Sequence, residues 1–148
     1  MIDPHYEVQK WIYDTLRNDT GVVAAMGGGI DVESRIWPED VAPEGTAYPY
    51  ITAVAQGGDQ GAQTVQGRVV WFEIVEIVRA TTDSEDISQI APISAAIFTA
   101  LNRKTGATDQ ARIISCAFDA PYRQYSEVDG EQLLSLGAFW RFQVQSLT

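Results

Sequence analysis

Apolar side chains recur at helical spacing at the start of the chain. Asp3 and Pro4 fit an N-cap and a first helical position, because a carboxylate accepts hydrogen bonds from first-turn amides and proline has no amide proton to lose there. The apolar stripe behind them is Val8, Trp11, Ile12, Thr15 and Leu16. This pattern predicts a helix from about residue 4 to residue 18, then a short helix over 22–26 that stops at the glycines of 27–29.

Aromatic and β-branched residues dominate two later segments, 48–55 and 65–79. They predict the two strands of a hairpin. The segment between them, Gln56 to Gln63, is rich in glycine and glutamine and predicts an unusually long, mobile hairpin tip. Before the hairpin, prolines break residues 30–49, where only 35–38 reads as a short extended piece.

The second strand of this hairpin is apolar on both faces. One face carries Val69, Trp71, Val75 and Ile77, and the other carries Val70, Phe72, Ile74 and Val78, with Glu73 and Glu76 as the exceptions. An antiparallel strand normally leaves one face to water, so both faces of this strand need cover. The chain has enough helix for one face only, and we expect the other face to meet a different surface.

The second half of the chain predicts one helix followed by strands. Apolar positions at helical spacing run from Asp83 to Asn102, and Pro92 inside them predicts a kink or a restart. Strands follow over 112–118 and 121–128, then a turn and a final alternating strand. The order predicts a single domain over residues 1–148 of the α+β class, an antiparallel sheet of four to five strands with two main helices packed on one face.

Composition narrows the partners. The chain has 148 residues, a mass of 16.3 kDa, a net charge of −10 and a pI near 4.3. Such acidity disfavours sequence-independent nucleic-acid binding and anionic membrane surfaces. The single cysteine excludes an internal disulfide. We find no signal-peptide pattern or long apolar run, so the expectation is a soluble protein of a reducing cytoplasm with no membrane partner.

Residues that could carry chemistry are few. His5 is the only histidine, and its place in a first helical turn predicts a solvent-facing or helix-end residue. Cys116 lies in an apolar strand and predicts a buried, unreactive thiol. Gly27-Gly28-Gly29 lacks the lysine of a phosphate-binding loop, and Asp83, Glu85 and Asp86 do not match a calcium loop. We therefore expect no enzyme and no catalytic, cofactor or metal residue; a carboxylate pair for hydrolysis stays open.

The ordered series of motifs resembles a known family. The motifs are Val22-Val23-Ala24-Ala25-Met26, Arg35-Ile36-Trp37-Pro38, Val41-Ala42-Pro43-Glu44-Gly45, Tyr48-Pro49-Tyr50-Ile51, Arg68-Val69-Val70-Trp71-Phe72-Glu73-Ile74, Ala100-Leu101, and a closing strand from Leu133 to Val144 after Tyr122, Tyr125 and Asp129-Gly130. Together they resemble the tail-terminator, or tail-completion, family of long-tailed siphophage-type bacteriophages and of gene-transfer particles derived from them. The tip from Gln56 to Gly67 and Pro92 depart from the family pattern.

The resemblance implies a structural virion protein of the neck region, assembled in the host cytoplasm. It implies a homo-hexameric ring that caps the head-proximal end of the tail tube, stops tube polymerisation and docks the head-completion or connector protein, with DNA only passing through the bore. We expect Val69, Trp71, Val75 and Ile77, or the opposite set Val70, Phe72 and Ile74, to face a neighbouring subunit. We expect Gly58, Asp59, Gln60, Gly61 and Gln63 in the tip to contact the tail tube.

Two alternatives remain at this point. The nearer one is another oligomeric neck protein, a head-completion adaptor or stopper. The other, from a different class, is a small acidic hydrolase that uses a carboxylate pair and works as a monomer with a closed pocket.

Overall fold

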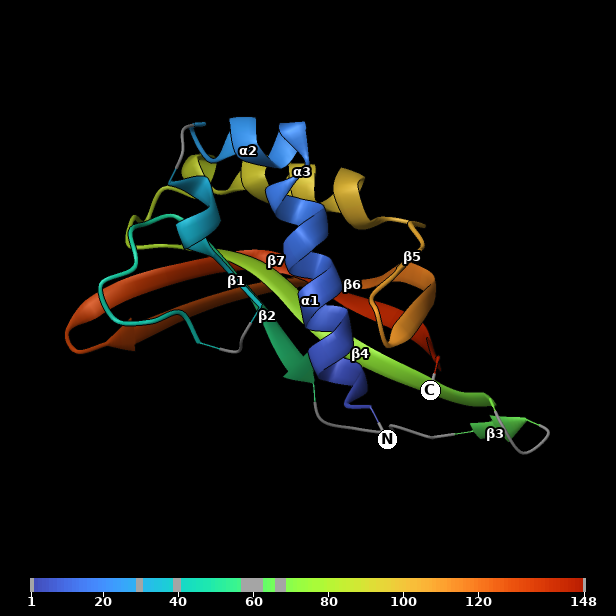
Figure 1. Cartoon of the computed structure of the whole chain (residues 1–148). Helices are drawn as coiled ribbons and strands as arrows, with labels where there is room; N and C mark the ends of the chain where they lie inside the picture. Colours follow the sequence, from blue (N-terminus) through green and yellow to red (C-terminus); the bar gives the residue numbers. More distant parts are fainter. Residues whose placement is uncertain (1, 29–30, 39–40, 57–62, 66–68, 148) are drawn as a thin grey trace.

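One twisted sheet with helices against a single face makes up the described part of the chain, residues 2–28, 31–38, 41–56, 63–65 and 69–147 of a computed structural model (Figure 1). Seven strands of these residues form the sheet, in the order β1-β2-β4-β7-β6-β5 with β3 paired to β4. They are β1 (Ile36–Trp37), β2 (Tyr50–Gln56), β3 (Gln63–Val65), β4 (Val69–Thr82), β5 (Gly106–Ala107), β6 (Ala111–Val128) and β7 (Glu131–Ser146). Only the β1–β2 pair is parallel.

The sequence therefore predicted the α+β class but too few strands. Four long strands, β2, β4, β6 and β7, are the ones that an alternating pattern can reveal. The additional strands β1, β3 and β5 have two or three residues each, which is too short for any periodicity. The two strands expected over 112–118 and 121–128 are one strand, β6, whose pairing with β7 shifts at two bulges instead of ending.

The opening helices form as the sequence predicts. Helix α1 (Pro4–Arg17) begins at Asp3, whose carboxylate accepts hydrogen bonds from the backbone N–H of His5 at 3.0 Å and of Tyr6 at 3.2 Å. Helix α2 (Thr20–Ala25) begins at Asp19 in the same way. It ends before two glycines with φ of +96° and +69°, the left-handed conformation that stops a helix.

The helix expected from Asp83 starts later than predicted. Residues Ile87–Gln89 form a single 3₁₀ turn, η2, and helix α3 runs only over Ala91–Leu101. Pro92 lies in the first turn of α3, where its missing N–H breaks no helical bond, so the proline starts this helix and does not kink it. Another 3₁₀ turn, η1 (Val32–Arg35), precedes β1.

A single apolar cluster lies between the helices and the sheet. It joins Val8, Ile12 and Leu16 of α1 and Ile93, Ile97 and Leu101 of α3 to the strand residues Phe72, Ile74, Val78, Trp140, Phe142 and Val144. Leu134, Ala138 and the alternate residues after it in β7 are buried on this helix side, as the alternation predicts. The strands β4 and β7 approach closely here, because a Cβ on Gly137 would collide with the Val78 carbonyl and lie 2.7 Å from the Arg79 Cα.

Candidate functional site

The face of the sheet opposite the helices is the candidate interaction surface. Along β4, Phe72, Ile74 and Val78 point into the helix layer, so the odd-numbered residues of this strand point the other way. Among the described residues no helix covers that side (Figure 1). We call it the helix-free face; it carries Trp71, Glu73, Val75, Ile77, Arg79 and Thr81 of β4 and the residues of β2, β6 and β7 that point the same way.

The four predicted interface residues differ in how much surface they keep. Ile77 is only 7% exposed, because its cross-strand neighbours Val54 in β2 and Phe139 in β7 enclose it. Trp71 and Val75 are half-buried and keep apolar surface toward solvent. Val69 belongs to β4, but its side chain lies outside the described residues. Among the described side chains of this set, Trp71 and Val75 are the ones that can still bury area on a neighbour.

The opposite set has less to offer a partner. Phe72 is 6% exposed and Ile74 is 1% exposed, because both lie under the chain's own helices. The side chain of Val70 lies outside the described residues. The alternative that this set faces a neighbouring subunit is therefore wrong for Phe72 and Ile74.

The guanidinium of Arg79, on the helix-free face, is held by one tyrosine and one threonine. Arg79 Nη1 donates to the Tyr122 hydroxyl at 3.0 Å, and Nε donates to Thr52 Oγ1 at 3.2 Å. The Tyr122 ring packs edge-on against Phe139 with centroids 5.7 Å apart. Burial raises the pKa of nearby Tyr50, while the charge of Arg79 and a hydrogen bond with Thr81 lower it. These contacts hold the side chains of Arg79 and Tyr122 in place without a binding partner.

Exposed charges border Trp71 and Val75. Arg141, the cross-strand partner of Val75, donates to Glu73 at 3.2 Å and lies 3.5 Å from Asp119. All three side chains are about half exposed, so each ion pair adds little stability. Their effect is to place a polar rim beside the apolar surface, which is the usual layout of a protein interface.

The predicted tube-contact residues fall mostly outside the described residues. Gly58, Asp59, Gln60 and Gly61 lie in the segment 57–62, for which the structure gives no placement. Gln63 is the first residue of β3, and its backbone pairs with Trp71 in β4. The sequence missed β3 because three residues next to glycines carry no strand periodicity. Through this pairing β3 lies beside the first residues of β4, within the sheet.

The one histidine is buried, which the sequence did not predict. His5 Nδ1 lies 2.9 Å from Oε1 of Glu76, His5 is 9% exposed and Glu76 is fully buried. His5 does lie at a helix end, in the first turn of α1. The signal that could have indicated a buried partner was Glu76, a carboxyl group on the apolar, helix-facing side of β4, because a buried polar group requires a partner.

Cys116 is buried as predicted, at 1% exposure, and burial raises the pKa of its thiol to about 12.

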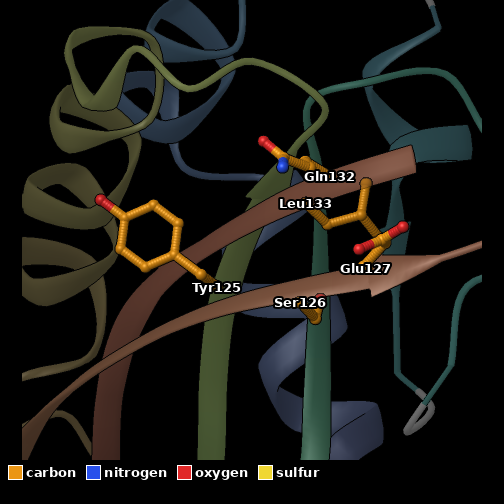
Figure 2. A pocket seen from close by; sticks show the side chains of 5 residues that line it. All are labelled: Tyr125, Ser126, Glu127, Gln132 and Leu133. Atoms are coloured by element: carbon orange, nitrogen blue, oxygen red, sulfur yellow. The ribbon is translucent and has the colours of Figure 1, made fainter. Parts of the chain in front are cut away.

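The described residues contain no cluster of three or more His, Cys, Asp or Glu arranged to hold a metal ion. A hollow of about 280 Å³ lies between the ends of β6 and β7 and is lined by Tyr125, Ser126, Glu127, Gln132 and Leu133 (Figure 2). Among all the residues that the structure describes, no helix is long and apolar enough to cross a membrane.

Comparison with solved structures finds a similar fold. A chain of the "Virion of native gene transfer agent (GTA) particle" superposes with a TM-score of 0.67 at 16% sequence identity. The match covers 94% of this chain and 95% of that chain. At this identity the match shows that the two chains share a fold. No protein-family model matches the sequence, and no curated protein matches it.

Proposed function

We propose that this chain is a structural virion protein of a phage-type particle. The observation that carries the proposal is the shared fold, which extends over nearly the whole of both chains. The sequence motifs independently resemble the tail-terminator family, and the two lines of argument point to the same kind of particle. The assembly partners would then be other virion proteins, and the protein would reside in the virion after assembly in the host cytoplasm.

The specific role we propose is that of a tail terminator. The chain forms a homo-hexameric ring on the head-proximal end of the tail tube, stops tube polymerisation and offers a docking face to the head-completion or connector protein. Trp71 and Val75 support this role, because they leave apolar surface next to a polar rim on the helix-free face. A heterologous contact through this face closes into a ring when the rotation between neighbours is a sixth of a turn.

A non-enzymatic role is part of the same proposal. The His5–Glu76 pair lies in the core between α1 and β4 and is used to join them. The Cys116 thiol is buried and held protonated. The net charge of −10 suits a ring through which DNA passes without being held, because like charges repel.

The test mixes the purified chain with tail tubes and follows two readouts, native mass and labelling of tube ends by electron microscopy. We expect a species of six times 16.3 kDa, alone or on the tubes, located at one end of each tube. Trp71→Asp should abolish ring formation while leaving the circular-dichroism spectrum unchanged. Tyr6→Asp is the matched control, because Tyr6 is an aromatic residue 54% exposed on the helix layer.

Particles that lack the protein separate the proposed role from that of an adaptor or stopper. Without a terminator, tubes grow overlong or stay headless. Filled heads that leak, with tubes of normal length, would contradict the terminator role and favour a stopper. A monomer that leaves tube ends bare would contradict the terminator role.

A further inference from the structure

The outer edge of β6 is unpaired along most of its length. β5 pairs only with Arg112 and Ile113, and the backbone N–H of Arg103 donates to the carbonyl of Cys116. Beyond Cys116, no strand of the described residues pairs with this edge, which continues to the turn that leads into β7. An open edge of this length is a template for another strand, and proteins normally shorten or cover such edges.

Two observations identify the backbone groups that point outward on this edge. Pro121 lies inside β6 opposite Ala138, and a proline is tolerated in a strand where its nitrogen faces away from the sheet. The turn to β7 has two residues, Asp129 and Gly130, with φ of +52° and +80°, so the flanking pair Val128 and Glu131 is hydrogen-bonded. Counting back from either end, the odd-numbered residues from 121 to 127 direct their backbone groups outward, which leaves both N–H and C=O groups open at 123, 125 and 127.

The side chains of these same residues share one side of the sheet. Arg123, Tyr125 and Glu127 pair with Leu136, Leu134 and Gln132 of β7. Tyr125 is 63% exposed, and Figure 2 shows its ring standing clear of the other labelled side chains. Arg123 donates to the Tyr125 hydroxyl at 2.9 Å and lies over its ring. The unpaired edge of β6 thus carries a cation, an aromatic ring and an anion at alternate positions, Arg123, Tyr125 and Glu127.

We propose that this edge pairs antiparallel with the same edge of a second copy of the chain, in a register centred on Tyr125. In that register Arg123 lies opposite Glu127 of the second copy, and Glu127 lies opposite its Arg123. The two Tyr125 rings meet at the two-fold axis. The outward N–H and C=O groups of residues 123, 125 and 127 then all bond across the axis.

The order of charges selects a second copy as the occupant. Reading the strand backwards turns cation–ring–anion into anion–ring–cation, so the edge is its own complement only in antiparallel self-pairing. Centring the pair on Arg123 or on Glu127 would place like charges opposite each other, which is destabilising. An isologous contact of this kind closes at two chains.

The proposed interface is small, so the fraction of the protein that forms the dimer should depend on protein concentration. A stable interface buries about 800 Å² on each partner, and a few edge residues with one ring bury less. The proposal does not rest on the terminator role, because a ring uses a heterologous contact through another face. If both hold, the edge joins two rings back to back or pairs subunits before they reach a tube.

A disulfide tests the register directly. In a hydrogen-bonded antiparallel pair the two Cα atoms are about 5.5 Å apart, within disulfide range. Tyr125→Cys should therefore form a covalent dimer of twice 16.3 kDa on mild oxidation. Gln124→Cys is the control, because residue 124 lies opposite residue 126 and points to the other side of the sheet. The native Cys116 is buried and does not compete.

A charge swap tests the pairing without a crosslink. Arg123→Glu and Glu127→Arg should each weaken dimerisation at least about tenfold in sedimentation equilibrium, because each places like charges opposite one another. The double variant restores unlike pairs and should return the dimer. Asp14→Arg on α1 should have no effect. Equal crosslinking of the two cysteine variants, or a double variant weaker than both single ones, would overturn the proposal, whatever the outcome at tube ends.

Discussion

Glu76 and His5 meet inside the protein, with Oε1 of the carboxylate 2.9 Å from Nδ1 of the imidazole. The contact joins the middle of β4 to the first turn of α1 across 71 positions of sequence. It lies on the helix side of the sheet, where both residues are buried. The pair therefore fixes the start of α1 against the sheet, in the same turn that Asp3 caps.

Removing the imidazole should destabilise the fold strongly. We expect His5→Ala to lower the free energy of unfolding by about 1–3 kcal/mol, because it removes a hydrogen-bonding partner from a fully buried carboxylate. Urea unfolding followed by tryptophan fluorescence measures the change. Tyr6→Ala, at an exposed position of the same turn, is the control. A loss below about 1 kcal/mol for His5→Ala would show that the pair contributes no more than a surface contact.

The sequence predicts those parts of the fold that repeat a local pattern. The cap of Asp3, the stripe of α1 and the alternation of β7 each depend on residues a few positions apart. The burial of His5 was missed because its partner lies 71 positions away. For the third helix the sequence left a kink and a restart at Pro92 open, because a proline is compatible with both, and the structure has the restart.

The candidate surface was predicted only in part, because the local pattern of β4 is visible in the sequence and the contacts with neighbouring strands are not. The doubly apolar pattern of β4, with helix enough for one face only, predicts a second face without helices, and no helix of the described residues lies on that face. Which residues stay open on that face depends on the neighbouring strands. Ile77 is closed off by Val54 and Phe139, and the register that aligns these three residues is set by the whole sheet.

Gly137 should not tolerate a side chain. A Cβ at this position would collide with the Val78 carbonyl of the neighbouring strand, so Gly137→Ala must push β4 and β7 apart. We expect a loss of about 1–3 kcal/mol, typical of overpacking, seen as a lower Tm in thermal unfolding. Gln143→Ala, at an exposed position of the same strand, should leave Tm nearly unchanged. An unchanged Tm for Gly137→Ala would contradict the close approach of the two strands.

The Cys116 thiol should be unreactive in the native protein. Burial raises its pKa from 9.0 to about 12, so its thiolate fraction at pH 8 is about a thousandfold lower than in the unfolded chain. Iodoacetamide labelling at pH 8, with and without urea, measures the ratio of rates. Comparable rates in both states would show that the thiol is accessible.

The buried thiol of Cys116 should make the free energy of unfolding fall at alkaline pH. The folded pKa is raised, so the protonated thiol stabilises the native state fully below pH 9.0, and this contribution is lost as pH rises from 9.0 toward about 12. Cys116→Ala should flatten the fall in the free energy of unfolding over this window. An identical fall in the variant would assign the effect to other groups, with the tyrosines as the next to examine.

Arg79 should hold down the pKa of Tyr50 on the helix-free face. Burial raises that pKa, and the guanidinium charge opposes the rise because it stabilises the phenolate. Arg79→Met keeps the aliphatic contact and removes the charge, so the Tyr50 pKa should rise further. An NMR titration of ¹³C-labelled tyrosine measures this shift. Arg123→Met, at the β6 edge, should leave the Tyr50 pKa unchanged, and a fall of that pKa in Arg79→Met would contradict the assigned cause.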